Sequence, residues 1–361
     1  MTYKILARKW RPQKFSQVCG HEYVIKAITN SIKLNKIHHA WIFSGNRGTG
    51  KTTIARILAK SLSCDYSITE NPCRKCFICK NIEKHCFSDF IEVDGASKTK
   101  VEDIKEMLST VFYSPLQGRF KIYLIDEIHM LSKHSFNALL KILEEPPKHV
   151  KFIFATTEIE KVPNTILSRC LIFKLNDLNF IEIYNFISKI LKKENIKIEP
   201  EALKIISNYS LGSIRDALNF LEQSIYIDNK KILTSTIINL LGTFNEEIIF
   251  KITQSIIKKN ITNTFKKLKQ CESSYFNWDY LLEEILKIFH FISMIKLYPS
   301  ILKNNYYMSS FENELLKIAK KLSFNQLKLY YKTILHGRSL IHLAPTKKIG
   351  IEMLLLEILH L

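Results

Sequence analysis

The stretch of sequence that decides the fold is Gly45-Asn46-Arg47-Gly48-Thr49-Gly50-Lys51-Thr52, which matches the phosphate-binding pattern G-x-x-x-x-G-K-[ST] at every specified position. The apolar run 40–43 comes directly before it, and residues 53–60, which have a helical pattern, follow it. This order of strand, glycine-rich loop and helix predicts a nucleotide site, because glycines let backbone N–H groups curl around phosphate oxygens at a helix N-terminus. Lys51 would neutralise the β- and γ-phosphates, and Thr52 would hold Mg²⁺ through its hydroxyl. We therefore expect all eight residues to bind a nucleotide.

A second apolar run, at 120–125, ends in Asp126 and Glu127. Its composition predicts a strand that is covered on both faces of a sheet. We assign to Asp126 the orientation of Mg²⁺ and its waters, and to Glu127 the polarisation of the attacking water in phosphoryl transfer. An acidic pair that caps the following helix is the alternative, and the intact phosphate loop makes it the weaker one.

The segment between these two motifs is longer than one strand and one helix require, and it contains a cluster of cysteines. The spacing C-x2-C-x2-C, with a further cysteine upstream, predicts an inserted zinc module at 64–79. Its four expected ligands are Cys64, Cys73, Cys76 and Cys79. An iron–sulfur centre is an alternative for this spacing, whereas disulfides are disfavoured because the chain shows no export signal. Cys86 is expected to be a spare free thiol.

The composition suits a large protein of two or three domains, since the chain has 361 residues of which 46% are hydrophobic. The formal net charge of +19 favours a nucleic-acid partner, although Lys, Ile and Asn are frequent throughout the chain and weaken this signal. The sequence contains no stretch of about 18 uncharged apolar residues, and its N-terminus lacks a secretory core. We therefore expect a cytoplasmic protein that does not contact a membrane.

The order of the expected elements divides the chain into three regions: 1–178, 179–242 and 243–361. The first region alternates strands and helices, which predicts a five-stranded parallel, doubly wound α/β sheet with helices on both faces. No strand is expected in the second and third regions, whose patterns are helical. The expected strands are 41–44, 90–93, 121–125, 152–155 and 171–174. The expected helices include 22–34, 51–63, 101–112, 132–143, 280–297 and 311–335.

Taken together, these features resemble the AAA+ ATPases, and within them the gamma/tau family of ATPase subunits of the bacterial DNA polymerase III clamp loader. The resemblance covers essentially the whole chain and is strongest from residue 6 to residue 242. Besides the phosphate loop and the four cysteines, its carriers are ARKWRP (7–12), HHA (38–40), VED (101–103), YLIDEIHML (123–131), NALLK (137–141), LEEPP (143–147), ATT (155–157), LSRC (167–170) and GSIRDA (212–217).

The resemblance implies roles for further residues. Segment 7–12 and the turn at 18–20 would border the adenine and ribose, and Thr157 would sense the γ-phosphate. Arg215 would reach the nucleotide from a helical lid. Arg169 would be an arginine finger in the neighbouring subunit's site, where an always protonated guanidinium compensates the charge of the transferring phosphoryl group. Without the resemblance, Thr157 would be interpreted as a strand-end cap and both arginines as surface charges.

The resemblance also implies an ATP-driven machine that opens a ring and tracks DNA. The expected cofactors are ATP, Mg²⁺ and Zn²⁺. The expected partners are the delta and delta prime clamp-loader subunits, further copies of the chain, the sliding clamp and primer-template DNA. Region 179–242 would be the lid, and region 243–361 a collar that holds the ring of subunits together. We expect the chain to correspond to the family's short form, without the tail that contacts the polymerase and the replicative helicase, and we expect no polymerase active site.

Two other functions compete with the clamp-loader interpretation. One is a different AAA+ machine, such as a branch-migration or remodelling motor. The other is a scaffold that binds DNA through the zinc module and does not hydrolyse ATP, which the intact Lys51, Asp126 and Glu127 oppose. Four histidines are candidates for metal ligands, but their spacing is not that of a metal site. We therefore expect them to pack in the interior or to lie on the polar surface. They are His38, His39, His129 and His134.

Overall fold

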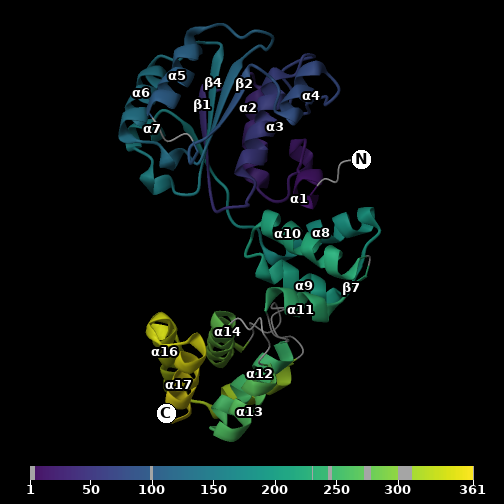
Figure 1. Cartoon of the computed structure of the whole chain (residues 1–361), viewed down its shortest axis with the longest axis vertical. Coiled ribbons are helices and arrows are strands. Elements are labelled where there is room, and N and C mark those ends of the chain that lie inside the picture. Colours follow the sequence, from purple (N-terminus) through teal and green to yellow (C-terminus); the bar gives the residue numbers. More distant parts are fainter. Residues whose placement is uncertain are drawn as a thin grey trace. The chain divides into compact units, whose positions relative to one another are not determined.

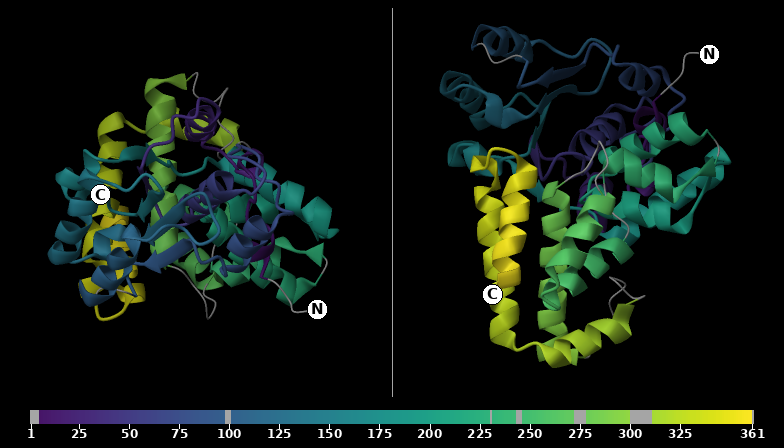
Figure 2. Two further views of the ribbon diagram at one scale, coloured as in Figure 1. Left: turned by 90° about the horizontal axis from the view of Figure 1, so that it is seen from above. Right: turned by 60° about the horizontal axis from the view of Figure 1, so that its bottom comes forward.

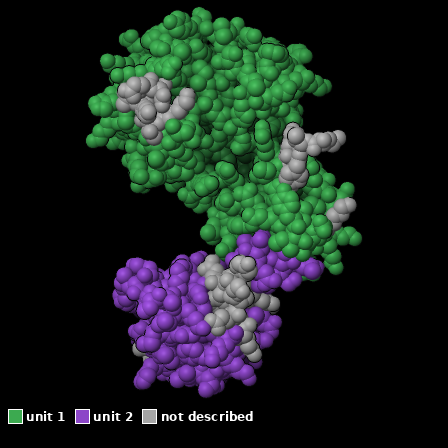
Figure 3. All heavy atoms as spheres, in the orientation of Figure 1, with its two compact units in different colours: residues 1–232 green, residues 233–361 purple. Residues whose placement is uncertain are grey.

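The computed structural model describes residues 5–97, 101–229, 231–242, 246–271, 278–299 and 311–360. The predicted border at residue 243 and the side chains of the VED motif at 101–103 lie outside the described residues. The chain divides into two compact units, residues 1–232 and residues 233–361 (Figure 3). Within the described ranges, no helix has the length and apolar character needed to cross a bilayer.

The first unit is built around a five-stranded parallel sheet with the strand order β2-β3-β4-β1-β5 (Figure 1). Successive side chains of a strand point to opposite faces, so helices can cover both. Trp41 and Phe43 share one buried cluster with helix α3, whereas Ile42 belongs to the cluster on the other face. The predicted parallel, doubly wound sheet is therefore confirmed. The strands are β1 (Ala40–Ser44), β2 (Phe90–Asp94), β3 (Lys121–Asp126), β4 (Val150–Thr156) and β5 (Leu171–Lys174).

Helices α2, α3 and α4 pack on one face of this sheet, and α5, α6 and α7 on the other (Figure 1). The helix predicted at 101–112 ends earlier, because its last three residues form a 3₁₀ turn. The bounds are α1 (Leu6–Lys9), η1 (Phe15–Gln17), α2 (Glu22–Lys33), α3 (Lys51–Ser63), α4 (Phe77–Lys84), α5 (Val101–Ser109), η2 (Thr110–Phe112), η3 (Ile128–Met130), α6 (Lys133–Glu144), η4 (Ile159–Lys161) and α7 (Asn164–Leu167).

Three helices follow the sheet within the first unit: α8 (Phe180–Glu194), α9 (Pro200–Tyr209) and α10 (Ile214–Asp228). Asn179 and Glu182 form a reciprocal capping box that starts α8, with N···O distances of 2.8 and 2.9 Å. The expectation of no strand after residue 178 is wrong, because β6 (Lys197–Ile198) and β7 (Lys231–Ile232) pair in parallel. Strands of two residues are too short to give an alternating pattern in the sequence.

The second unit is helical, and most of its described helices pack around a buried cluster that centres on α14. Helices α16 and α17 run side by side within it (Figure 2). The single helix predicted at 311–335 is wrong, since a capping box of Ser323 with Gln326 starts a new helix there. The helices are α11 (Thr234–Leu241), α12 (Glu246–Ile257), α13 (Ile261–Cys271), α14 (Trp278–Leu297), α15 (Glu312–Lys321), α16 (Phe324–Leu340), η7 (Ile341–Leu343) and α17 (Lys347–His360).

Candidate functional site

The glycine-rich loop connects the end of β1 to the first residue of α3, as the sequence predicts. Gly48 and Gly50 have φ angles of 82° and 103°, which residues with a Cβ rarely adopt. The Lys51 ammonium lies inside the loop, where it donates to the carbonyl oxygens of Gly45 (2.8 Å) and Asn46 (2.9 Å). Burial lowers the pKa of Lys51, and the nearby Glu127 opposes this shift. A buried cation at the N-terminus of a helix is a site for phosphate.

The end of β3 meets the start of α3 at the carboxyl edge of the sheet. Thr52 donates from its hydroxyl to Asp126 Oδ2 at 2.7 Å. The two residues converge because β3 and β1 both flank β4 in parallel, so their carboxyl ends lie at one edge. A hydroxyl and a carboxylate are oxygen ligands of the kind that Mg²⁺ takes beside substrate phosphates. The donor set therefore fits this ion.

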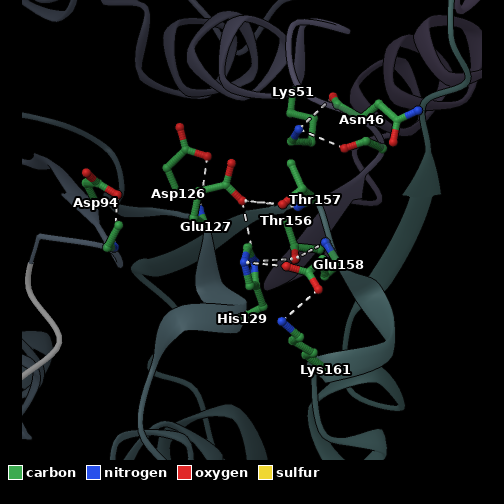
Figure 4. Close-up of polar contacts among 12 residues, drawn as sticks. Asn46, Lys51, Asp94, Asp126, Glu127, His129, Thr156, Thr157, Glu158 and Lys161 are labelled. Atoms are coloured by element: carbon green, nitrogen blue, oxygen red, sulfur yellow. Dashed lines mark hydrogen bonds and ion pairs between the residues drawn. The ribbon is translucent and has the colours of Figure 1, made fainter. Parts of the chain in front are cut away.

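Glu127 follows Asp126 in a left-handed backbone conformation, with φ 48° and ψ 49°. Its Oε2 accepts hydrogen bonds from the backbone N–H and from the hydroxyl of Thr157, both at 3.1 Å (Figure 4). The structure thus brings together two residues that the sequence places at the ends of different strands. Both ends lie at the edge of the sheet that carries the phosphate loop.

A cavity of about 460 Å³ opens between the N-terminal segment, the glycine-rich loop and α10. Its size is in the range of small-molecule sites. Five arginines line it: Arg8, Arg11, Arg47, Arg56 and Arg215. Burial, and next the neighbouring Arg56, lower the pKa of Arg11 to about 10. Other lining residues include Ala7, Trp10, Pro12, Val18, Cys19, Thr49, Lys51, Thr52, Asp126 and Glu127. Cations in this number suit a polyanion such as a nucleoside triphosphate.

Specific contacts hold the lid helices against the rest of this cavity. The backbone N–H of Leu6 donates to Glu222 Oε2 of α10 at 3.1 Å, and the indole of Trp10 donates to Glu194 Oε1 of α8 at 2.7 Å. A Cβ on Gly48 would overlap the hydroxyl of Ser213, the N-cap of α10. Arg215 is the second residue of α10, and its Cβ would lie 3.4 Å from the same added atom, so the loop and the start of α10 are in close contact.

Arg169 lies away from this cavity and is not among the residues that line it. It follows α7 and forms an ion pair with Glu144 at 2.8 Å, while its guanidinium also donates to the carbonyl oxygen of Thr165 at 2.7 Å. The side chain is one-third exposed. The structure therefore does not bring Arg169 to the nucleotide site of its own chain.

The sulfur atoms of the four predicted zinc ligands lie within 4.8 Å of one another. Tetrahedral Zn–S bonds of about 2.3 Å would place sulfurs roughly 3.8 Å apart, and the Cys73 and Cys79 sulfurs are 3.9 Å apart. Backbone N–H groups of Lys75 and Cys76 donate to Cys73 Sγ. Burial raises the pKa of Cys73, but these donors, together with hydrogen bonds from the side chains of Cys76 and Cys64, outweigh it and lower the pKa to about 7. The donor set fits Zn²⁺. The exposed Cys86 is not in the cluster. The cluster consists of Cys64, Cys73, Cys76 and Cys79.

Two features of the site could not be recognised from the sequence. The sequence analysis placed segment 7–12 beside adenine and ribose, but it did not predict that Arg8 and Arg11 converge with Arg56 of α3. It also assigned His129 to packing or polar surface, and it did not predict that its Nδ1 lies near both Glu127 Oε2 and Thr156 Oγ1. The position of His129 two residues after Glu127 was the only available signal.

The three regions match family models in sequence. Residues 20–179 match "DNA polymerase III, delta subunit", residues 182–229 match "DNA polymerase III clamp loader subunit, ATPase lid domain", and residues 232–361 match "DNA polymerase III subunits gamma and tau domain III". Among solved structures, the Holliday junction branch migration motor RuvB of Thermotoga maritima has a TM-score of 0.49 at 20% identity, over 69% of this chain and 80% of that chain. That likeness is too distant to bear on function.

Curated relatives match over almost the whole chain. DNA polymerase III subunit gamma of Buchnera aphidicola subsp. Schizaphis graminum is 50% identical, over 99% of this chain and 98% of the relative. DNA polymerase III subunit tau of Escherichia coli K12 is 44% identical, over 99% of this chain and 56% of the relative. Together with the phosphate loop, the lid and the helical C-terminal unit, these matches show that the chain belongs to the gamma/tau family of DNA polymerase III clamp-loader subunits, which are AAA+ P-loop ATPases.

Proposed function

We propose that the chain is the ATP-binding and ATP-hydrolysing motor subunit of a clamp loader, which places a sliding clamp on primed DNA during chromosomal replication. The observation that carries this proposal is the convergence of Lys51, Thr52 and Asp126 beside a cavity lined by five arginines. Membership of the gamma/tau family over the whole chain supports the choice of a clamp loader among AAA+ machines.

Each residue of the site has a distinct task in the proposed reaction. The N–H groups of the loop, from Gly45 to Thr52, and the Lys51 ammonium hold the phosphates of ATP. Thr52 and Asp126 would hold Mg²⁺, which would supply positive charge beside the phosphates of ATP. Glu127 accepts a proton from the attacking water, and Thr157 orients the Glu127 carboxylate or the γ-phosphate with its single hydroxyl proton. Arg215 reaches the phosphates from α10.

The site needs a second subunit to be complete. Arg169 stands outside its own cavity and is partly exposed, which supports a role in the site of a neighbouring chain. There its guanidinium would exchange Glu144 for the transferring phosphoryl group and stabilise the charge of the transition state. We therefore propose an assembly with the delta and delta prime subunits and with further copies of this chain, which acts on the clamp and on primer-template DNA.

We propose structural roles for the remaining parts. The four cysteines of the module at 64–79 would bind one Zn²⁺ in a closed site, because four thiolates leave no position for a reactive water. Residues 179–242 would act as the lid, which links the binding of nucleotide to the conformation of the subunit. The helical region from 243 onward would form the collar, since amphipathic helices must bury their apolar faces in their own bundle or in a neighbour.

An ATPase assay tests this function. The rate of ATP hydrolysis should rise when primed DNA and clamp are added together to the complex that contains this chain. A protein that hydrolyses ATP only with four-way junctions, and moves them, would be a branch-migration motor instead. A protein that never hydrolyses ATP would be a scaffold. Both of these results would reject the proposal.

A further inference from the structure

His129 lies in the turn η3, two residues after Glu127, and only 6% of its side chain is exposed. Both of its ring nitrogens face polar groups (Figure 4). Nδ1 lies 3.1 Å from Thr156 Oγ1 and 3.4 Å from Glu127 Oε2. Nε2 lies 3.4 Å from Glu158 Oε1. The imidazole therefore connects the end of β3, which carries Glu127, to the end of β4.

The Glu127 carboxylate depends on such support. Its left-handed backbone costs on the order of 1 kcal/mol, so this conformation must be held by surrounding contacts. Oε2 is fixed by the N–H and the hydroxyl of Thr157, and His129 stands beside the same atom. Within the described residues, no hydrogen bond reaches Oε1. The carboxylate thus has one anchored oxygen and one oxygen available to a water.

The far side of the ring is anchored as well. Glu158 pairs with Lys161 at 2.8 Å. The hydrogen bond from Lys161 is the largest cause that lowers the pKa of Glu158, and the charge of His129 is a smaller one. The backbone N–H of Glu158 also donates to Thr156 Oγ1 at 3.1 Å. His129 is therefore fixed from both directions, which a side chain that only fills space does not require.

We propose that His129 is a positioning residue for ATP hydrolysis, in which both ring nitrogens carry a proton: Nδ1–H aligns the Glu127 carboxylate, and Nε2–H ties the ring to Glu158. The inference rests on the proposed function, in which Glu127 accepts the proton of the attacking water. His129 does not line the nucleotide cavity, so it acts on the chemical step through Glu127 and not on ATP itself.

The two nitrogens can be tested separately by substitution. Asn at position 129 places a polar atom near Nδ1 and retains the contacts with Glu127 and Thr156, whereas Gln reaches the position of Nε2 and retains only Glu158. His129→Ala should lower kcat roughly 10- to 100-fold, the scale expected when a catalytic group is displaced by about 1 Å. KM for ATP should stay within about twofold, because binding is not affected. His129→Asn should recover most of kcat, and His129→Gln should not.

Steady-state ATPase of the assembled complex, with primed DNA and clamp, measures these constants. His134→Ala is the matched control, since His134 is an exposed histidine at the start of α6. Unchanged kcat in His129→Ala, equal rates in the Asn and Gln variants, or loss of nucleotide binding by the Asn variant would each overturn the proposal. If the wild-type complex itself does not hydrolyse ATP, the proposed function fails before any variant is compared.

Discussion

Gly48 offers a sharp test of how the lid meets the phosphate loop. The phosphate-loop motif does not specify a residue at this position, so a substitution there leaves the motif itself unchanged. Its φ is 82°, and a Cβ there would overlap the Ser213 hydroxyl and lie 3.0 Å from Ser213 Cβ. Ser213 is the N-cap of α10, and its hydroxyl accepts from the N–H of Asp216 at 3.2 Å. A methyl group at Gly48 must therefore push the first turn of the lid helix, which carries Arg215.

The size of the effect follows from two costs. A residue with a Cβ in the left-handed region costs about 1 kcal/mol relative to glycine. Displacing the Ser213 hydroxyl loses an N-cap, which costs about 1 kcal/mol more. When the clash is relieved by movement of the lid and not of the loop, both costs apply. Gly48→Ala should then weaken ATP binding by about 2 kcal/mol, or roughly 30-fold.

Titration of a fluorescent ATP analogue, followed by a double-mutant cycle with Ser213→Ala, measures this effect. Ser213→Ala alone should cost about 1 kcal/mol for the lost cap. The double variant should cost about 2 kcal/mol and not the sum of about 3, because the clashing oxygen is already gone and the two sites are coupled. Additive costs, or binding by Gly48→Ala equal to wild type, would refute the close approach of loop and lid.

Three further predictions concern the remaining site residues. Lys51→Ala removes the buried cation of the loop and should weaken ATP binding roughly 10- to 100-fold, the scale of a lost hydrogen bond to a charged group; calorimetry that finds unchanged affinity would contradict the phosphate site. Arg169→Ala should leave ATP binding intact but lower hydrolysis in the assembled complex on the order of 10³-fold, and a normal rate would exclude the finger. Metal analysis should find one zinc per chain in the wild type and in Cys86→Ser, but less in Cys64→Ser. Iron in the wild type, or the reverse order of the two variants, would overturn the four-cysteine assignment.

The fold could be predicted from the sequence where local patterns are strong. The loop residues Gly45 to Thr52 and the apolar run before Asp126 determine a strand, a turn and a helix on their own, and parallel strands then place Thr52 beside Asp126. The gathering of Cys64, Cys73, Cys76 and Cys79 in one cluster was predicted from their spacing. These motifs needed no knowledge of the tertiary structure.

Contacts between distant segments could not be predicted in the same way. Gly48 faces Ser213, and Arg11 faces Arg56, only because the lid and the N-terminal segment fold over the loop. The role of His129 could not be predicted from a sequence pattern, since besides the nearby Glu127 its partners are on β4 and in the turn after it. The break before Ser323 was missed because apolar residues keep a helical spacing across it, and only the capping box interrupts the helix.

The most direct test of the account is clamp loading itself. The chain would be combined with the delta and delta prime subunits, and the number of clamps retained on primed circular DNA would be counted after gel filtration, with and without ATP. The account predicts ATP-dependent loading by the wild-type chain and none by Lys51→Ala. Loading that does not require ATP, or no loading by a complex that does assemble, would contradict it.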